Sequence, residues 1–142
     1  MTTTQRERLP YRHVLTVPAV GSAVRIARET TELVLIECGV GLRHPSIGPA
    51  LLILAELVTN SVQHAASLTP AITVTYAHGP GVLAFAVHDR HPYQPPLYEA
   101  LAGAPGSGLA TVVEMTMELG GTAVVRGDAD GRGKSIWITL PL

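Results

Sequence analysis

The chain of 142 residues contains little cysteine and few aromatic residues. Its one cysteine, Cys38, cannot form an internal disulfide, and we expect it to be buried in a helix as a small apolar side chain. The sequence has a single Trp and a single Phe. The hydrophobic core must therefore consist mainly of Leu, Val, Ile and Ala.

The chain also lacks a strong charge of either sign and long hydrophobic runs. Its net charge is -1, its pI is about 6.6, and Lys and Arg are scattered, which argues against direct nucleic-acid binding. No apolar run approaches the roughly 20 residues that span a bilayer. The N-terminal segment MTTTQRERLP is polar and has no apolar signal-peptide region. We expect a soluble, cytoplasmic protein without membrane contact.

With 46% hydrophobic residues, the chain fits one domain with a real core. Residues 1–10 lack periodicity and are expected to form a disordered tail, which leaves 11–142 as the folded domain. Hydrophobic spacing then predicts the remaining elements. These are a strand at 11–17, a helix at 19–38, a helix beginning at 45–46, a hairpin with strands at 72–76 and 82–88, a helix at 109–119, and strands at 122–126 and 135–140.

This order of elements predicts an α/β (α+β) two-layer sandwich. The sheet is expected to be mixed but mostly antiparallel, with the three helices covering one face. Residues 90–105 include four prolines and have no clear period, so they are expected to form a long loop. Loops of this length in a small domain are usually functional or mobile.

The second predicted helix contains polar residues at four-residue steps: Glu56, Asn60 and His64. This spacing places a carboxylate, an amide and an imidazole along one helix face. Such a row can hold a hydrated divalent cation and a general base. It can equally be the solvated edge of an amphipathic helix.

Two further features could belong to the same site. Asp89 follows Leu83, Phe85 and Val87 at alternate positions of a strand, so its carboxylate is expected on the core side, where it needs a partner. Alternatively, Asp89 begins a turn. The segment Gly106-Ser107-Gly108 precedes Leu109 and opens a helix, where backbone amides can bind phosphate or simply begin the helix.

Two other patterns carry less weight. Gly133-Lys134-Ser135 is similar to the end of a phosphate-binding P-loop, but the earlier glycine is missing and a strand follows where a helix is required. His88 and His91 flank Asp89, but no cysteine or second ligand pair lies nearby in the sequence. Neither pattern supports a site.

Together these segments resemble the Bergerat-type ATP-binding fold of histidine kinases, Hsp90, type II topoisomerases and mismatch-repair proteins. The likeness is strongest to its small stand-alone branch, the anti-sigma factor serine kinases. ELVTNSVQHA resembles the N box of that branch, VLAFAVHDR the strand into its G1 box, and GSGLATVVEMTMELG its G2 box and helix. The resemblance covers about residues 12 to 140, including GRGKSIWITL in the last hairpin.

The resemblance implies ATP and Mg²⁺ as ligands. Asn60 would coordinate Mg²⁺, and Glu56 would accept the proton of a serine hydroxyl that attacks the γ-phosphate. Asp89 would accept a hydrogen bond from the adenine amino group. The nucleotide phosphates would lie on the segment Gly106, Ser107, Gly108 and Leu109, and His64 has no assigned chemistry.

Three positions differ from the family pattern. His91 stands where the G1 box has glycine, and Ser107 is neutral where related proteins often have a basic residue. The family also often provides a threonine to the adenine site near the last strand. In this chain either Lys134 or Ser135 could occupy that position.

The resemblance implies an anti-sigma-type serine/threonine kinase that phosphorylates an anti-anti-sigma antagonist protein and binds a sigma factor, and it allows a homodimer. A second hypothesis is a non-catalytic module that keeps the fold and acts by protein binding, with weak or no ATP turnover. A third hypothesis, an ATP hydrolase without a protein substrate, has less support because we expect no second domain to use the energy.

Overall fold

The computed structural model describes residues 9, 11–41, 43–65, 67–68, 70–93, 95 and 108–142. Apart from Leu9, the predicted tail at 1–10 lies outside the described residues. Most of the predicted loop at 90–105 lies outside them as well, as do Gly106 and Ser107. The predicted domain limits therefore stay a prediction.

The described residues form five strands and three helices, in an order that confirms the predicted fold class. The elements are β1 (Tyr11–Pro18), α2 (Ala23–Glu37), α3 (Ile47–Ala65), β2 (Ala71–Gly79), β3 (Val82–Asp89), α4 (Gly108–Glu118), β4 (Thr122–Gly127) and β5 (Lys134–Pro141).

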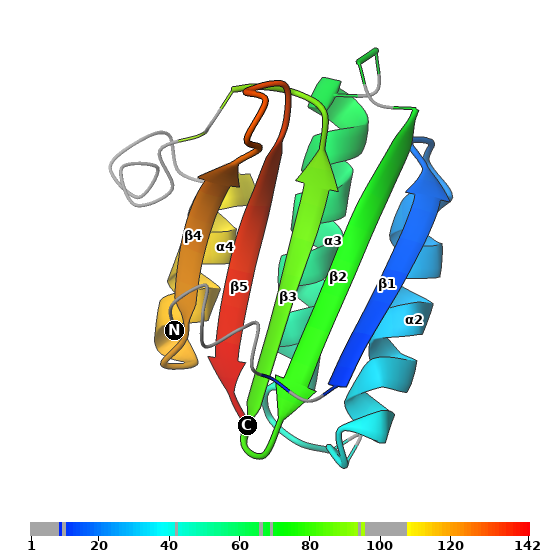
Figure 1. Ribbon diagram of the computed structural model, residues 1–142. Helices are drawn as coiled ribbons and strands as arrows, with labels where there is room; N and C mark the ends of the chain where they lie inside the picture. The colour runs from blue at the N-terminus through cyan, green and yellow to red at the C-terminus, as the bar shows by residue number, and fades with distance from the viewer. Residues whose placement is uncertain are drawn as a thin grey trace.

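The strands form one sheet in the order β1-β2-β3-β5-β4, and all four pairings are antiparallel. Figure 1 shows the three helices on one face of this sheet, with α3 behind its centre. The first strand lies at an edge, as its position in the sequence predicts. The structure is therefore a two-layer α+β sandwich.

The first helix begins at Ala23, four residues later than its hydrophobic spacing predicts. Residues 19–22 instead form bends and turns, because the Ala19 amide donates to Pro70 O and the Ala23 amide donates to Val20 O. The helix ends at Glu37, where Gly39 takes a φ of 81°. A positive φ is easily adopted only by glycine, which explains the stop.

The core lies between the helices and the sheet and is mainly aliphatic, as the composition predicts. Tyr76 and Phe85 are its largest fully buried side chains, and Leu, Ile and Val supply the others. Cys38 is half-buried rather than buried, because it follows the last turn of α2 and lines a cavity there. The prediction that Cys38 is buried is therefore only partly correct.

None of the helices among the described residues is both long and apolar enough to cross a membrane.

Candidate functional site

The predicted site residues that the structure describes lie at one end of the sheet, where β3 ends, β5 begins and α4 starts beside α3 (Figure 1). α3 contacts both β3 and α4, so its second half forms one wall of this region. Glu56 and Asn60 are half-buried on α3, and His64 is exposed near its C-terminal end. The row of polar residues that the four-residue spacing predicts therefore lies along the wall that α3 forms in this region.

Asp89 is buried, with 3% of its surface exposed, and three donors hold its carboxylate. Lys134 Nζ donates to Oδ1 over 2.8 Å, and the His91 amide donates to the same oxygen over 3.0 Å. Ser61 Oγ donates to Oδ2 over 2.7 Å. The buried carboxylate thus has the partners that its placement in the core requires.

Two neighbouring cavities share the wall formed by α3. One, of about 360 Å³, contains Asp89 in its lining, and the other, of about 350 Å³, contains Glu56. Asn60, His64 and Leu109 line both. Each cavity has the size of a small-molecule site, and the pair suits an elongated ligand that passes Asn60 on its way from Asp89 to Glu56.

The start of α4 lies directly against Glu56. A Cβ atom added to Gly108 would lie 2.7 Å from Oε2 of Glu56, closer than a carbon and an oxygen normally approach. Glycine at this position therefore leaves room for the Glu56 carboxylate in the second cavity. The preceding Gly106 and Ser107 lie outside the described residues.

A charged network behind the site fixes the end of β3. Asp128 Oδ2 contacts His88 Nε2 at 2.8 Å and Arg90 at 2.9 Å, and Arg90 also donates to Asp130 over 3.0 Å. A Cβ on Gly133 would lie 2.6 Å from the Asp89 carbonyl oxygen. The turn between β4 and β5 is thus packed against the backbone of Asp89.

A family model described as histidine kinase-, DNA gyrase B-, and HSP90-like ATPase matches residues 48–142. The chain belongs to this ATPase family. The match begins within α3 and includes β2, β3, α4, β4 and β5, so it contains every described residue of the two cavities. The chain therefore carries an ATP-binding domain of the histidine kinase, gyrase and Hsp90 type.

Solved structures show the same ATPase-type fold. The RsbU and RsbW domains of Rv1364c from Mycobacterium tuberculosis match with a TM-score of 0.60 and 22% identity, over 92% of this chain and 33% of that chain. The histidine kinase domain from the Erythrobacter litoralis EL346 blue-light activated histidine kinase matches with a TM-score of 0.54 and 24% identity, over 68% of this chain and 44% of that one. Full-length ShkA in complex with AMPPNP matches with a TM-score of 0.56 and 22% identity, over 91% of this chain and 31% of that chain.

The chain thus spans less than half the length of these three structures, and at such identities the likeness establishes the fold. Among curated proteins, no sequence match to the chain is found. Membership of the ATPase family therefore stands on the family model and the fold.

Two residues contact Asp89 that the sequence did not assign: Ser61 was missed, and the choice between Lys134 and Ser135 was left open. Lys134 is the only lysine of the chain and faces Asp89 across the β3–β5 pair, whereas Ser135 lies opposite His88. Lys134, rather than Ser135, is therefore the residue beside the Asp89 carboxylate. A signal existed in the sequence, because Lys134 shares the parity of Ile136 and Ile138 and so belongs on the core side.

Proposed function

We propose that this chain binds MgATP in the two cavities and is an anti-sigma-type serine/threonine kinase. It would transfer the γ-phosphate to an anti-anti-sigma antagonist protein and control transcription through a sigma factor, in the cytoplasm and without contact to nucleic acid or membrane. One observation carries the ATP-binding part of the proposal: Asn60 lines both cavities, with Asp89 in one and Glu56 in the other.

In this proposal the adenine base lies in the cavity that contains Asp89. A carboxylate has about four lone-pair sites, and three of them face Lys134, His91 and Ser61. The remaining site would accept the adenine amino group. Tyr93 and Leu109 also line this cavity and offer apolar surface to the base.

The phosphates would lie at the start of α4. The N-terminus of a helix attracts anions through its free amides and its dipole, and Gly108 lets the chain approach closely. The resemblance adds Gly106, Ser107 and Leu109 to this segment. The Asn60 amide oxygen is a hard ligand that fits Mg²⁺, which usually takes one or two protein oxygens and would neutralise phosphate charge when bound.

Glu56 would act as the general base. Its carboxylate accepts the proton of a serine or threonine hydroxyl on the partner while the hydroxyl oxygen forms a bond to the γ-phosphorus. The bond from that phosphorus to the β–γ bridging oxygen breaks, and ADP leaves with the electron pair. The half-buried position of Glu56 beside the start of α4 supports this role.

The choice of an anti-sigma-type kinase among the activities of the family rests on the motif resemblance in α3 and α4. The structural likeness to a chain that contains RsbU and RsbW domains is compatible with it. The edge position of β1 also allows a homodimer through this strand.

Binding is tested by calorimetric titration with MgATP. The Asn60→Ala variant is expected to lose at least about tenfold in affinity, since it removes the magnesium ligand. Glu114→Gln, exposed on α4, is the control and should bind like wild type. If neither wild type nor control binds at millimolar nucleotide, ATP is not the ligand.

Catalysis is tested with labelled ATP and a candidate antagonist protein. Glu56→Gln is expected to reduce phosphate transfer by about 10²- to 10⁴-fold while MgATP still binds. Glu118→Gln, exposed on α4, should transfer at the wild-type rate. Equal transfer by wild type and Glu56→Gln would remove Glu56 from the mechanism.

The alternative of a non-catalytic binding module is favoured by a specific contact. The Lys134 ammonium already neutralises Asp89 and uses part of its hydrogen-bonding capacity. In this alternative the chain keeps the fold, binds ATP weakly or not at all, and acts by protein binding. Partner binding that is unaffected by MgATP and by Asn60→Ala would support it against the kinase proposal.

A further inference from the structure

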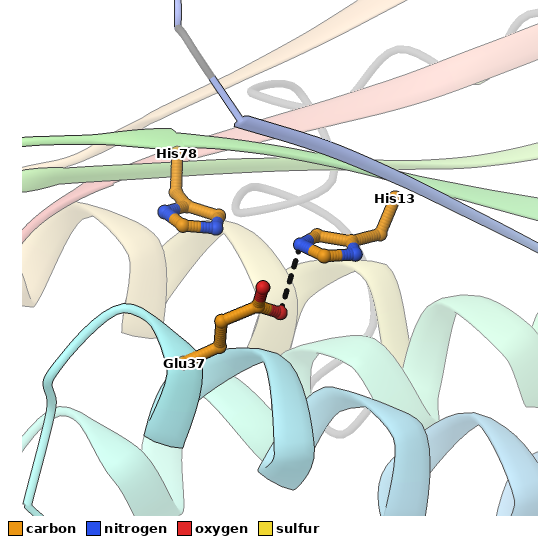
Figure 2. Close-up of side chains that lie close together, drawn as sticks. All are labelled: His13, Glu37 and His78. Carbon is orange, nitrogen blue, oxygen red and sulfur yellow. Dashed lines mark ion pairs between the residues drawn. The ribbon is translucent and has the colours of Figure 1, made fainter.

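Three side chains that could bind a metal converge at the other end of the sheet from the ATP-type cavities. They are His13 on β1, His78 near the end of β2 and Glu37 in the last turn of α2. Figure 2 shows the two imidazole rings directed from the sheet toward the helix, with the Glu37 carboxylate rising between them. We call these residues the His13–Glu37–His78 cluster.

Strand register brings the two histidines together. Tyr11 pairs with His78 and His13 pairs with Tyr76, so His13 and His78 are diagonal neighbours on one face of the sheet. Tyr76 is fully buried on this face, which the helices cover. The two rings are nearly parallel, with an interplanar angle of 4° and centroids 5.5 Å apart.

The ring nitrogens of the cluster are poorly satisfied. His78 is 4% exposed, and its Nε2 is buried without a hydrogen-bond partner among the described residues. His13 Nε2 lies 3.0 Å from Glu37 Oε2, but this contact does not have the geometry of a hydrogen bond. A buried polar atom without a partner destabilises the fold, so such atoms in a native protein usually have a ligand or a role.

We propose that His13, Glu37 and His78 bind a Zn²⁺ ion. One ligand atom from each residue lies within 4.8 Å of the other two. In a tetrahedral zinc site with bonds of about 2.0 to 2.2 Å, neighbouring ligand atoms are about 3.3 Å apart. The 3.0 Å contact between His13 and Glu37 is close to such an edge, and the His78 ligand atom, within 4.8 Å of both, would move closer on metal binding to complete the triangle.

The chemistry of the donors favours zinc over magnesium. Imidazole nitrogen suits Zn²⁺ and similar transition metals, whereas Mg²⁺ prefers oxygen ligands. The cluster is therefore chemically distinct from the proposed magnesium position at Asn60.

A cavity of about 560 Å³ adjoins the cluster. Glu37 and His78 line it together with Cys38 and His44. Three protein ligands beside an open cavity leave the fourth position of a zinc ion to water or to a small exogenous ligand. The ion would also tie the edge strand β1 to β2 and to the end of α2.

The proposal is tested by titrating tag-free, metal-free protein with ZnCl₂, followed by calorimetry and thermal unfolding. Co²⁺ replaces Zn²⁺ in a parallel titration, because its visible absorption reports a four- or five-coordinate site. We expect one ion per chain, a higher Tm with Zn²⁺, and an intense visible Co²⁺ spectrum. Absence of binding at stoichiometric metal would overturn the proposal.

Matched variants locate the site. Glu37→Gln keeps the volume of a largely exposed side chain and does not disturb the core, and His78→Ala removes the buried ligand. Each is expected to weaken binding by more than the roughly 10- to 100-fold that loss of an outer-shell partner costs. Glu32→Gln, exposed on the same helix, and His64→Gln, exposed on α3, should bind zinc like wild type.

The outcomes separate the proposal from a simple His13–Glu37 ion pair. If Glu37→Gln lowers Tm equally with and without Zn²⁺ and leaves zinc affinity unchanged, the contact is structural and the proposal is wrong. It is equally wrong if His64→Gln removes binding, because the metal then lies elsewhere. Loss of the Co²⁺ spectrum in Glu37→Gln and His78→Ala, with retention in both controls, supports it.

Discussion

The Lys134 ammonium lies 2.8 Å from Oδ1 of Asp89, and the exposed fractions of the two side chains are 8% and 4%. A charge pair this deeply buried contributes little net stability, but removing one partner leaves a buried charge without compensation. The Lys134→Met variant is therefore expected to lower the free energy of unfolding by about 3 to 5 kcal/mol. Urea denaturation monitored by circular dichroism measures the change.

The same pair predicts strong coupling between the two positions. The double variant Asp89→Asn with Lys134→Met removes both charges, so it should be more stable than Lys134→Met alone. The coupling energy is expected to be about 0.5 to 3 kcal/mol, the range for residues in contact. Additive single and double changes would mean that the two groups do not interact in solution.

Gly108→Ala is predicted to impair phosphate transfer without unfolding the protein. The new Cβ would lie 2.7 Å from Glu56 Oε2, and the flexible carboxylate can move away at little cost. Stability should change by less than about 1 kcal/mol, since alanine also favours a helix. A base displaced by about 1 Å can lose about 10²-fold in rate, which a kinase assay beside urea denaturation would detect.

Gly48→Ala is the control for this substitution. Gly48 lies in the first turn of α3, and nothing lies within 4 Å of a Cβ added there. The variant should transfer phosphate normally. If Gly108→Ala also retains the wild-type rate, the contact with Glu56 has no part in catalysis.

Because Tyr76 is buried, the protein is expected to become less stable at high pH. Burial raises the pKa of Tyr76 from 10.0 to about 12, and its hydrogen bond to Thr31 opposes this only in part. Between these values the unfolded chain has released the proton and the folded chain keeps it, so the free energy of unfolding falls as pH rises. The stabilisation that comes from the raised pKa of Tyr76 is fully present below pH 10. About 2 to 3 kcal/mol of the free energy of unfolding is lost as the pH rises from 10 to the folded-state pKa of about 12.

Urea denaturation at several pH values checks this. Tyr76→Phe should show a flatter decline with pH, at a cost of about 1 kcal/mol at neutral pH for the lost hydrogen bond. Tyr93→Phe changes an exposed tyrosine and should keep the wild-type slope. Equal slopes for all three proteins would contradict the assignment to Tyr76.

The sequence alone could predict which residues face the core but not which of them meet. Asp89 shares the parity of Leu83 and Phe85, and this parity correctly places it on the buried side. Its contact with Lys134 joins positions 45 residues apart and depends on β5 entering the sheet between β3 and β4. Hydrophobic alternation contains no information about that strand order.

The His13–Glu37–His78 cluster could not be predicted for the same reason. Its three residues are far apart in sequence, and no ligand spacing connects them. They meet because the β1–β2 register makes the histidines diagonal neighbours and because α2 ends at Glu37. By contrast, the spacing of Glu56 and Asn60 is local to one helix, so it could be predicted from the sequence.

The single lysine offers a direct spectroscopic test of both proposed sites. Protein labelled with ¹³C only in lysine should give one ε-methylene signal, because Lys134 is the only lysine. MgATP bound beside Asp89 changes the charges around this group and should shift the signal. Zn²⁺ bound at the His13–Glu37–His78 cluster lies at the other end of the sheet and should leave it unchanged. A shift with Zn²⁺ but not with MgATP would contradict the placement of both ligands.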